Sequence, residues 1–138
     1  DATEQGGVID YRDWQIPLGR RFRALKLWLT LYTEGAEQLR CTIRKHIALS
    51  QALAQKLDQL DVEVLEPQTL GLVAFAAKDN QTTEELQRRI NHSRKTWLTH
   101  AEIGGRRWIR VAVGAWRTEE HHMDMLYREI ESALKNDA

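Results

Sequence analysis

The first part of the chain arranges apolar and polar residues with the period of amphipathic helices. Apolar residues recur every three to four positions in two runs, one beginning at about residue 22 and the other covering 39–60. Gly35 lies between the runs and interrupts the pattern. The sequence therefore predicts two long helices, each of which must bury its apolar face against a partner surface.

The next part of the chain changes to the patterns of short strands. Four apolar or alternating segments predict strands at 62–65, 70–75, 96–103 and 107–113. A brief turn around Pro67 joins the first two strands, which we expect to be neighbours. Gly104 and Gly105 separate the last two strands, a pair that is typical of a tight hairpin.

Two further helices complete the predicted order. Thr82 with Glu85 has the spacing of a capping box, which predicts a helix over about 83–93. Thr118 is expected to cap a last helix whose apolar residues face inward. The result is an α/β chain, helix-helix followed by β-β-α-β-β-α. This layout occurs in ligand sensors, RNA binders and enzyme subdomains, so it does not by itself indicate a function.

Composition and charge exclude several classes of protein. The formal net charge is zero and 29% of residues are charged, so no overall field favours nucleic acid or a membrane surface. No apolar run approaches the roughly 20 residues needed to cross a bilayer. The single Cys41 cannot form an internal disulfide, which favours a reducing, cytoplasmic setting, and we expect it to be at least half-buried. The five histidines lack the spacing of a metal site.

The most specific motif is the stretch Asp-Trp-Gln-Ile-Pro-Leu-Gly-Arg-Arg-Phe-Arg-Ala-Leu-Lys-Leu-Trp at 13–28. It resembles the segment that follows the catalytic loop in aromatic-L-amino-acid decarboxylases, which are group II enzymes dependent on pyridoxal phosphate. Shorter similarities follow in the order of that family, at Gly35, Leu39, 43–46, Leu49, 72–75, Asn91, 98–100, 109–114 and 118–119. The resemblance covers about 8–134.

The resemblance implies a C-terminal fragment of an enzyme with the aspartate-aminotransferase-like fold, known as fold type I. Residues 1–34 would be the end of the large, cofactor-binding domain, with a loop over 1–19 and the connecting helix from about residue 20. Residues 35–138 would be the small domain. Members of the family are homodimers with intertwined active sites, and we expect the same here.

The resemblance also implies that catalytic residues lie elsewhere. The lysine that binds pyridoxal phosphate follows a histidine in this family, and none of the six lysines in the chain has that context. We therefore expect no catalytic, cofactor-binding or metal-binding residue in this segment. The fragment alone is expected to be inactive, because an amine that holds the cofactor as an imine is indispensable.

Gly19 is the first of two residues for which the resemblance implies contact with substrate. It matches a position near the substrate side chain, reached across the dimer interface, where glycine leaves room for an aromatic group. The alternative is that the backbone after Pro17 requires a glycine.

Arg110 is the second candidate substrate-binding residue. Strand alternation places it on the same face as Trp108 and on the face opposite Ile109. A mid-strand arginine is costly to bury without an anion, and the family match implies a substrate carboxylate nearby. The alternative is a structural salt bridge, either to Glu102 on the paired strand or to an acid of the large domain.

The functional hypothesis is part of a decarboxylase that converts an aromatic L-amino acid such as DOPA, tyrosine or tryptophan to its amine and carbon dioxide. A relative that acts on histidine, glutamate or 2,4-diaminobutyrate, or that couples decarboxylation to oxidative deamination, stays open. So does a non-catalytic small-domain module that binds a ligand or a protein.

Overall fold

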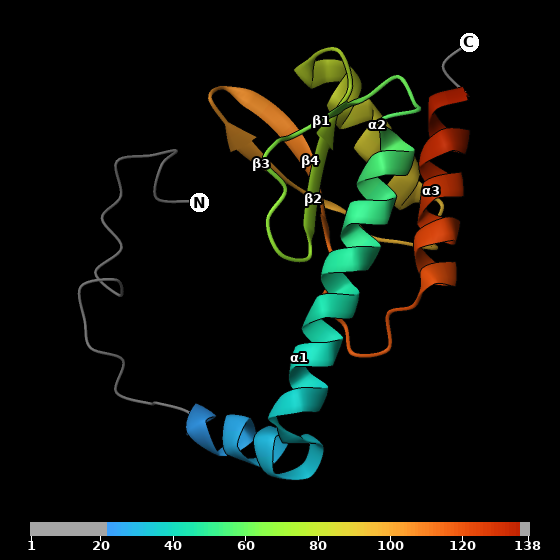
Figure 1. Cartoon of the computed structure of the whole chain (residues 1–138). Helices are drawn as coiled ribbons and strands as arrows, with labels where there is room; N and C mark the ends of the chain where they lie inside the picture. The colour runs from blue at the N-terminus through green and yellow to red at the C-terminus, as the bar shows by residue number, and fades with distance from the viewer. Residues whose placement is uncertain (1–21, 136–138) are drawn as a thin grey trace, which may run out of the picture. The chain divides into compact units, whose positions relative to one another are not determined.

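The structure is a computed structural model that describes residues 22–135, apart from the side chain of Arg23. Its elements are the helices α1 (Arg23–Leu57), α2 (Asn80–His92) and α3 (Glu120–Lys135) and the strands β1 (Glu63–Val64), β2 (Leu72–Ala76), β3 (Thr99–Ile103) and β4 (Arg106–Ala112) (Figure 1). This order confirms the predicted helix-helix, β-β-α-β-β-α arrangement. The predicted loop over 1–19, with Gly19, lies outside the described residues.

Gly35 divides α1 into two helical segments. Its backbone angles, φ 79° and ψ 158°, are not helical, although the assigned helix runs through it. Positive φ is readily adopted only by glycine, which explains why the break falls at this residue. The chain divides at the same point into two compact units, 1–35 and 36–138. The prediction of two helices separated at Gly35 is confirmed.

The four strands form one antiparallel sheet in the order β1-β2-β4-β3. β2 pairs with β4 at the centre, and the hairpin joins β4 to the edge strand β3. Gly104 and Gly105, at φ 60° and 77°, make the two-residue turn between them. The four strands predicted from the sequence are all present, with bounds that differ from the predicted ones by at most three residues.

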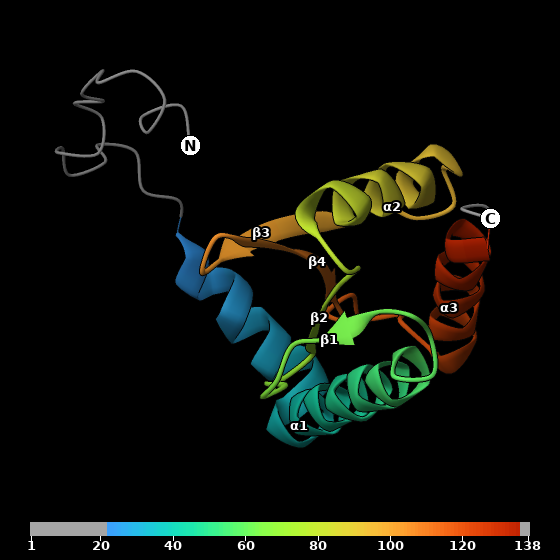
Figure 2. The ribbon, with the colours of Figure 1, turned by 90° about the horizontal axis from the view of Figure 1, so that it is seen from above.

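The hydrophobic core lies between one face of the sheet and three helical segments. Figure 2 shows α2, α3 and the second segment of α1 arranged around that face. The fully buried contributors from the sheet and helices are Val73, Phe75, Ile109, Leu53, Leu57, Ile90 and Ile130. Burying so much apolar surface on one side is the main stabilising contribution to the 36–138 unit.

The buried side of α1 is polar over its middle part. Thr42, His46 and Ser50 are its buried residues there, and they give way to Leu53 and Leu57 further along. Ser50 donates to the carbonyl oxygens of residues 47 and 70, at 2.8 and 3.1 Å.

Cys41 lies beside this buried polar stripe and is exposed. The expectation that it is at least half-buried is therefore wrong. Position 41 precedes the stripe by one residue, which on a helix is a turn of about 100° away from the buried side.

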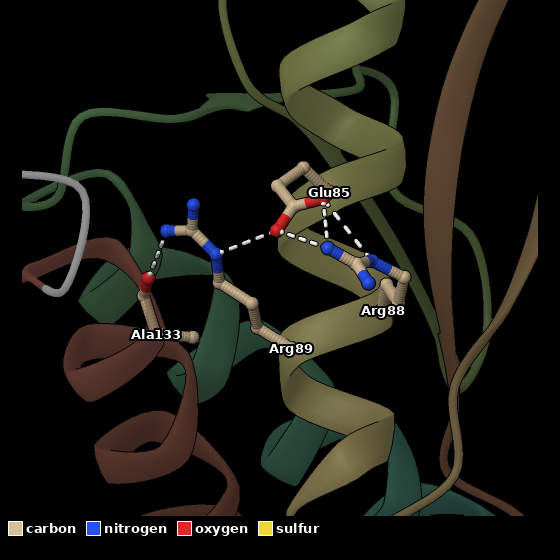
Figure 3. Close-up of polar contacts among 4 residues, drawn as sticks. All are labelled: Glu85, Arg88, Arg89 and Ala133. Carbon is tan, nitrogen blue, oxygen red and sulfur yellow. Dashed lines mark hydrogen bonds and ion pairs between the residues drawn. The ribbon is translucent and has the colours of Figure 1, made fainter.

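The start of α2 corrects the predicted capping box. Asp79 is the N-cap, and its carboxylate accepts a hydrogen bond from the backbone N–H of Thr82 at 2.8 Å. Glu85 instead binds Arg88 and Arg89 (Figure 3). The helix begins three residues earlier than predicted because aspartate is itself a strong N-cap residue.

Arg89 also connects α2 to α3. Figure 3 shows its guanidinium between Glu85 and the carbonyl oxygen of Ala133, to which it donates at 3.3 Å. The last turn of α3 thereby gains a donor for a carbonyl that the helix itself leaves unpaired.

Replacing Gly71 with alanine is expected to destabilise the fold. A Cβ there would lie 2.5 Å from the carbonyl oxygen of Val113. The two backbones are held close because the N–H of Val113 donates to the carbonyl oxygen of Gly71 at 2.7 Å. We expect Gly71→Ala to lower the free energy of unfolding by about 1–3 kcal/mol in urea titrations. Gly114→Ala is the control, since a Cβ there meets nothing within 4 Å. Equal stability of the two variants would contradict the close approach.

Asp79 is expected to stabilise α2 in a pH-dependent way. The backbone hydrogen bond from Thr82 lowers the pKa of Asp79 below its ordinary 3.8. Its contribution is therefore present above that value and lost as the pH falls through the folded-state pKa. Asp79→Ala should lower the urea midpoint at neutral pH, and the difference should vanish in acid. Asp61→Ala, at another exposed aspartate, serves as control; a pH-independent deficit in Asp79→Ala would refute the cap.

Candidate functional site

The face of the sheet turned away from the helices carries the candidate site. Trp108, Ala74 and Ala76 are buried on it and pack with Leu65 in a small cluster separate from the main core. Arg110 lies on the same strand face, two residues beyond Trp108, and is exposed. The predicted alternation along β4 is therefore confirmed, with Arg110 on the face opposite the core.

Arg110 has small neighbours on both sides. The register places Ala74 of β2 and Thr99 of β3 directly opposite it. Among residues 22–135 the structure gives Arg110 no hydrogen bond or ion pair through its side chain. The guanidinium, with its five donors, is thus available to an anion such as a carboxylate.

The register excludes one of the two structural alternatives for Arg110. Glu102 lies opposite Arg107 rather than Arg110, and Arg107 itself pairs with Glu84 of α2 at 3.1 Å. The predicted alternative of a salt bridge between Arg110 and Glu102 is therefore not formed. Contact of Arg110 with a substrate stays a prediction, as does contact with an acid of another domain.

A second arginine on this face, Arg106, was not singled out from the sequence. It pairs with Glu63 at 2.6 Å, donates to the carbonyl oxygen of Ala77 at 3.1 Å, and lies 4.9 Å from the ring centroid of Trp108. These contacts account for the cation, so Arg106 supports the sheet and Arg110 is the arginine left for a ligand. The signal in the sequence was the two-residue spacing of 106, 108 and 110.

The lysines of the chain do not fit the cofactor that the resemblance implies. A lysine that forms an imine with pyridoxal phosphate needs a lowered pKa or a neighbouring base in a pocket. Lys56 has the opposite property, because its hydrogen bond to Asp124 raises its pKa. Lys135 likewise has a raised pKa through Glu131.

The other lysines offer no better candidate. Lys95 pairs with Glu129, Lys45 lies 4.0 Å from Glu119, and Lys26 and Lys78 are exposed. No lysine of this chain is therefore assigned to forming an imine with the cofactor.

The described part of the chain offers neither a metal-binding cluster nor a membrane-spanning helix. Over residues 22–135 no group of three or more His, Cys, Asp or Glu side chains could hold a metal ion. Within the same residues, no helix combines the length and apolar character needed to cross a membrane.

The isolated 138-residue chain is expected not to retain pyridoxal phosphate. After incubation with the cofactor and dialysis, we expect no absorbance band of an internal aldimine, because Lys56 and Lys135 have raised pKa values and the other lysines lie exposed or beside carboxylates. Borohydride reduction followed by peptide mass spectrometry should label no lysine in preference to the others. A stable aldimine band, or stoichiometric labelling of one lysine, would contradict the assignment.

Comparison with known proteins places the chain among decarboxylases. The family model described as the pyridoxal-dependent decarboxylase conserved domain matches residues 2–78, more than half of the chain. The chain is 44% identical over 132 residues to 3,4-dihydroxyphenylacetaldehyde synthase of Drosophila melanogaster, covering 94% of this chain and 26% of that protein. It is 41% identical over 133 residues to aromatic-L-amino-acid decarboxylase of Manduca sexta, covering 95% and 26%.

A solved structure shows the same fold. The crystal structure of Oryza sativa TDC with PLP and tryptamine superposes with a TM-score of 0.79 at 30% identity, over 99% of this chain and 30% of that one. The chain thus spans between a quarter and a third of the length of these relatives. The expected fold of a pyridoxal-phosphate decarboxylase segment is confirmed, and the chain belongs to the pyridoxal-dependent decarboxylase family.

Proposed function

We propose that this chain is the C-terminal part of a pyridoxal-phosphate-dependent decarboxylase that converts an aromatic L-amino acid to its amine and carbon dioxide. The observation that carries the proposal is the match over 92–95% of the chain to enzymes named for tyrosine, tryptophan and other aromatic amino acids. No lysine of the chain is suited to forming an imine with pyridoxal phosphate. This supports the proposal that other residues of the parent enzyme bind the cofactor.

The contribution of this segment is recognition. Residues 1–34 would end the large domain and connect it to a small domain of 35–138; the division of the chain at Gly35 supports this boundary. Arg110 would face the substrate, directly or through the wall of its pocket. Its exposure on a sheet face that the helices leave uncovered supports that role. Gly19 would leave room for the aromatic side chain.

The first helical segment supports a homodimer. Phe22, Trp28 and Tyr32 expose 74%, 57% and 76% of their surfaces, and the rings of Trp28 and Tyr32 stack with centroids 5.2 Å apart. Apolar side chains concentrated to this degree on one short helix are typical of a surface that another subunit or domain buries. A homodimer with shared active sites is consistent with that exposure. The single Cys41, which cannot form an internal disulfide, supports a location in the cytoplasm.

A second activity is favoured by one specific finding. The Drosophila melanogaster relative is named as an aldehyde synthase, and so is a Rhodiola rosea enzyme whose structure superposes with a TM-score of 0.78 at 33% identity. The alternative is therefore a parent enzyme that releases carbon dioxide, ammonia and an aldehyde by oxidative deamination, in which dioxygen is the two-electron oxidant and leaves as hydrogen peroxide, and water supplies the aldehyde oxygen. Its substrate would still be an aromatic amino acid.

The product of the full-length protein distinguishes these activities. The protein, supplied with pyridoxal phosphate, is incubated with DOPA, tyrosine or tryptophan, and with histidine, glutamate and 2,4-diaminobutyrate for comparison. Release of the amine supports the decarboxylase, and release of aldehyde with ammonia supports the synthase. Turnover of only the three non-aromatic amino acids would overturn the proposed substrate class, and no turnover of any would favour a non-catalytic module.

Replacing Arg110 is expected to weaken catalysis without unfolding the chain, because the residue is exposed. Loss of a charge-assisted hydrogen bond at the pocket should lower kcat/KM by about 10- to 100-fold in Arg110→Ala, with partial recovery in Arg110→Lys. Arg40→Ala removes an exposed arginine paired with Glu37 on α1 and should leave kcat/KM unchanged. Equal kinetics in Arg110→Ala and Arg40→Ala would exclude Arg110 from substrate recognition.

A further inference from the structure

A groove between α2 and the edge strand β3 lies on the side of the sheet covered by the helices, away from Arg110. It has a volume of about 850 Å³, within the range of small-molecule sites. All residues that line it fall between positions 84 and 107, beyond the segment 2–78 that the family model matches.

Hydrogen bonds fix one end of the groove. The side-chain amides of Gln87 and Asn91 both donate to the carbonyl oxygen of Leu98 at 2.9 Å, and the Leu98 N–H donates to the Asn91 side-chain oxygen at 2.8 Å. These bonds hold the start of the hairpin against α2 by specific polar contacts.

The other end of the groove is fixed in the same manner. The Asn80 side chain accepts from the backbone N–H of Arg107 at 2.8 Å and donates to the carbonyl oxygen of Gly105 at 2.9 Å. Arg107 in turn pairs with Glu84. Walls held at both ends form a site before any ligand arrives, which lowers the entropic cost of binding.

The lining of the groove carries four cations. Arg88, Arg94, Lys95 and Arg107 line it, while Glu84 is the one acidic residue among its described lining residues. Arg88, Lys95 and Arg107 pair with Glu85, Glu129 and Glu84, respectively. The chain as a whole has a net charge of zero, so this excess is local. Clusters of guanidinium and ammonium groups bind carboxylate and phosphate groups.

The helix dipole explains only part of this charge. Cations near the C-terminus of α2 stabilise that helix, which accounts for residues such as Arg94 and Lys95. It does not account for Arg107, which lies on the strand side of the groove.

Arg94 is the cation most available to a ligand. It is exposed, and within the described part of the chain no ion pair involves it. Its backbone has φ 59°, a conformation that is unfavourable for residues other than glycine, asparagine and aspartate. Because Arg94 directly follows the C-cap Ser93, its positive φ ends the helix, and its side chain, without an ion pair among residues 22–135, is available to an anion.

Trp97 adds an aromatic surface at the same place. It is 77% exposed and takes no part in either core cluster, so the cores of the described chain do not account for a tryptophan there. An exposed ring beside cations suits a ligand with a planar ring and an anionic group, because the ring can stack while the cations bind the charge. From this arrangement we infer that the groove is a binding site for a small anion that carries a planar ring, such as a nucleoside phosphate or an aromatic carboxylate.

Isothermal titration calorimetry on the full-length protein tests the inference. The two ring-bearing probes are ATP, whose anionic group is a phosphate, and indole-3-acetate, whose anionic group is a carboxylate. Inorganic pyrophosphate, which has no ring, and indole, which has no charge, are the controls. At least one of the two ring-bearing anions should bind saturably, and about tenfold or more tightly than both pyrophosphate and indole. Saturable binding of neither ring-bearing anion would overturn the inference, and so would equal affinity for pyrophosphate or indole.

Paired variants locate the binding. Arg94→Gly removes the charge and relieves the positive φ, so the fold should be retained or stabilised. Arg94→Gly and Trp97→Ala should each weaken binding about tenfold or more. Arg44→Ala and Trp116→Ala, exposed residues outside the groove lining, should bind as the unchanged protein does. Binding that survives both groove variants would place the anion elsewhere, for example in the substrate pocket, and would overturn the inference.

Discussion

The one-sided burial of the antiparallel sheet is the constraint on which the rest of the 36–138 unit depends. Val73, Phe75 and Ile109 are fully buried on the helix side, and their burial fixes which face of β2 and β4 turns inward. A strand has a side-chain period of two, so the same choice turns Trp108 and Arg110 outward. The position of the candidate substrate-binding arginine is thus a consequence of core packing.

Much of the fold could be predicted from the sequence because its signals are local. The break at Gly35 and the hairpin turn at Gly104 and Gly105 each depend on what glycine alone adopts readily. The position of Glu102 opposite Arg107 also follows from the turn, because a two-residue loop sets every pairing in the hairpin. The alternative of a salt bridge from Glu102 to Arg110 is wrong because this register pairs Arg110 with Thr99.

Other features could not be predicted because two residues compete for one role or because the feature depends on how elements pack together. Thr82 and Asp79 both suit the start of α2, and only the structure shows that the aspartate side chain takes the bond. The face of α1 that carries Cys41 depends on how the helix packs. The groove beside Trp97 forms only when α2 and β3 pack together, so the pattern of either element alone does not reveal it.

The polar stripe on α1 has a consequence for the order in which this helix opens. Thr42, His46 and Ser50 are its buried residues before position 53, and the Nε2 atom of His46 is buried without a hydrogen-bond partner among the described residues. This part of the helix contributes little apolar burial, whereas Leu53 and Leu57 anchor the end nearer the strands. Backbone amides in the middle of α1 should therefore exchange with solvent through local opening, while those near Leu57 exchange only when the whole unit unfolds.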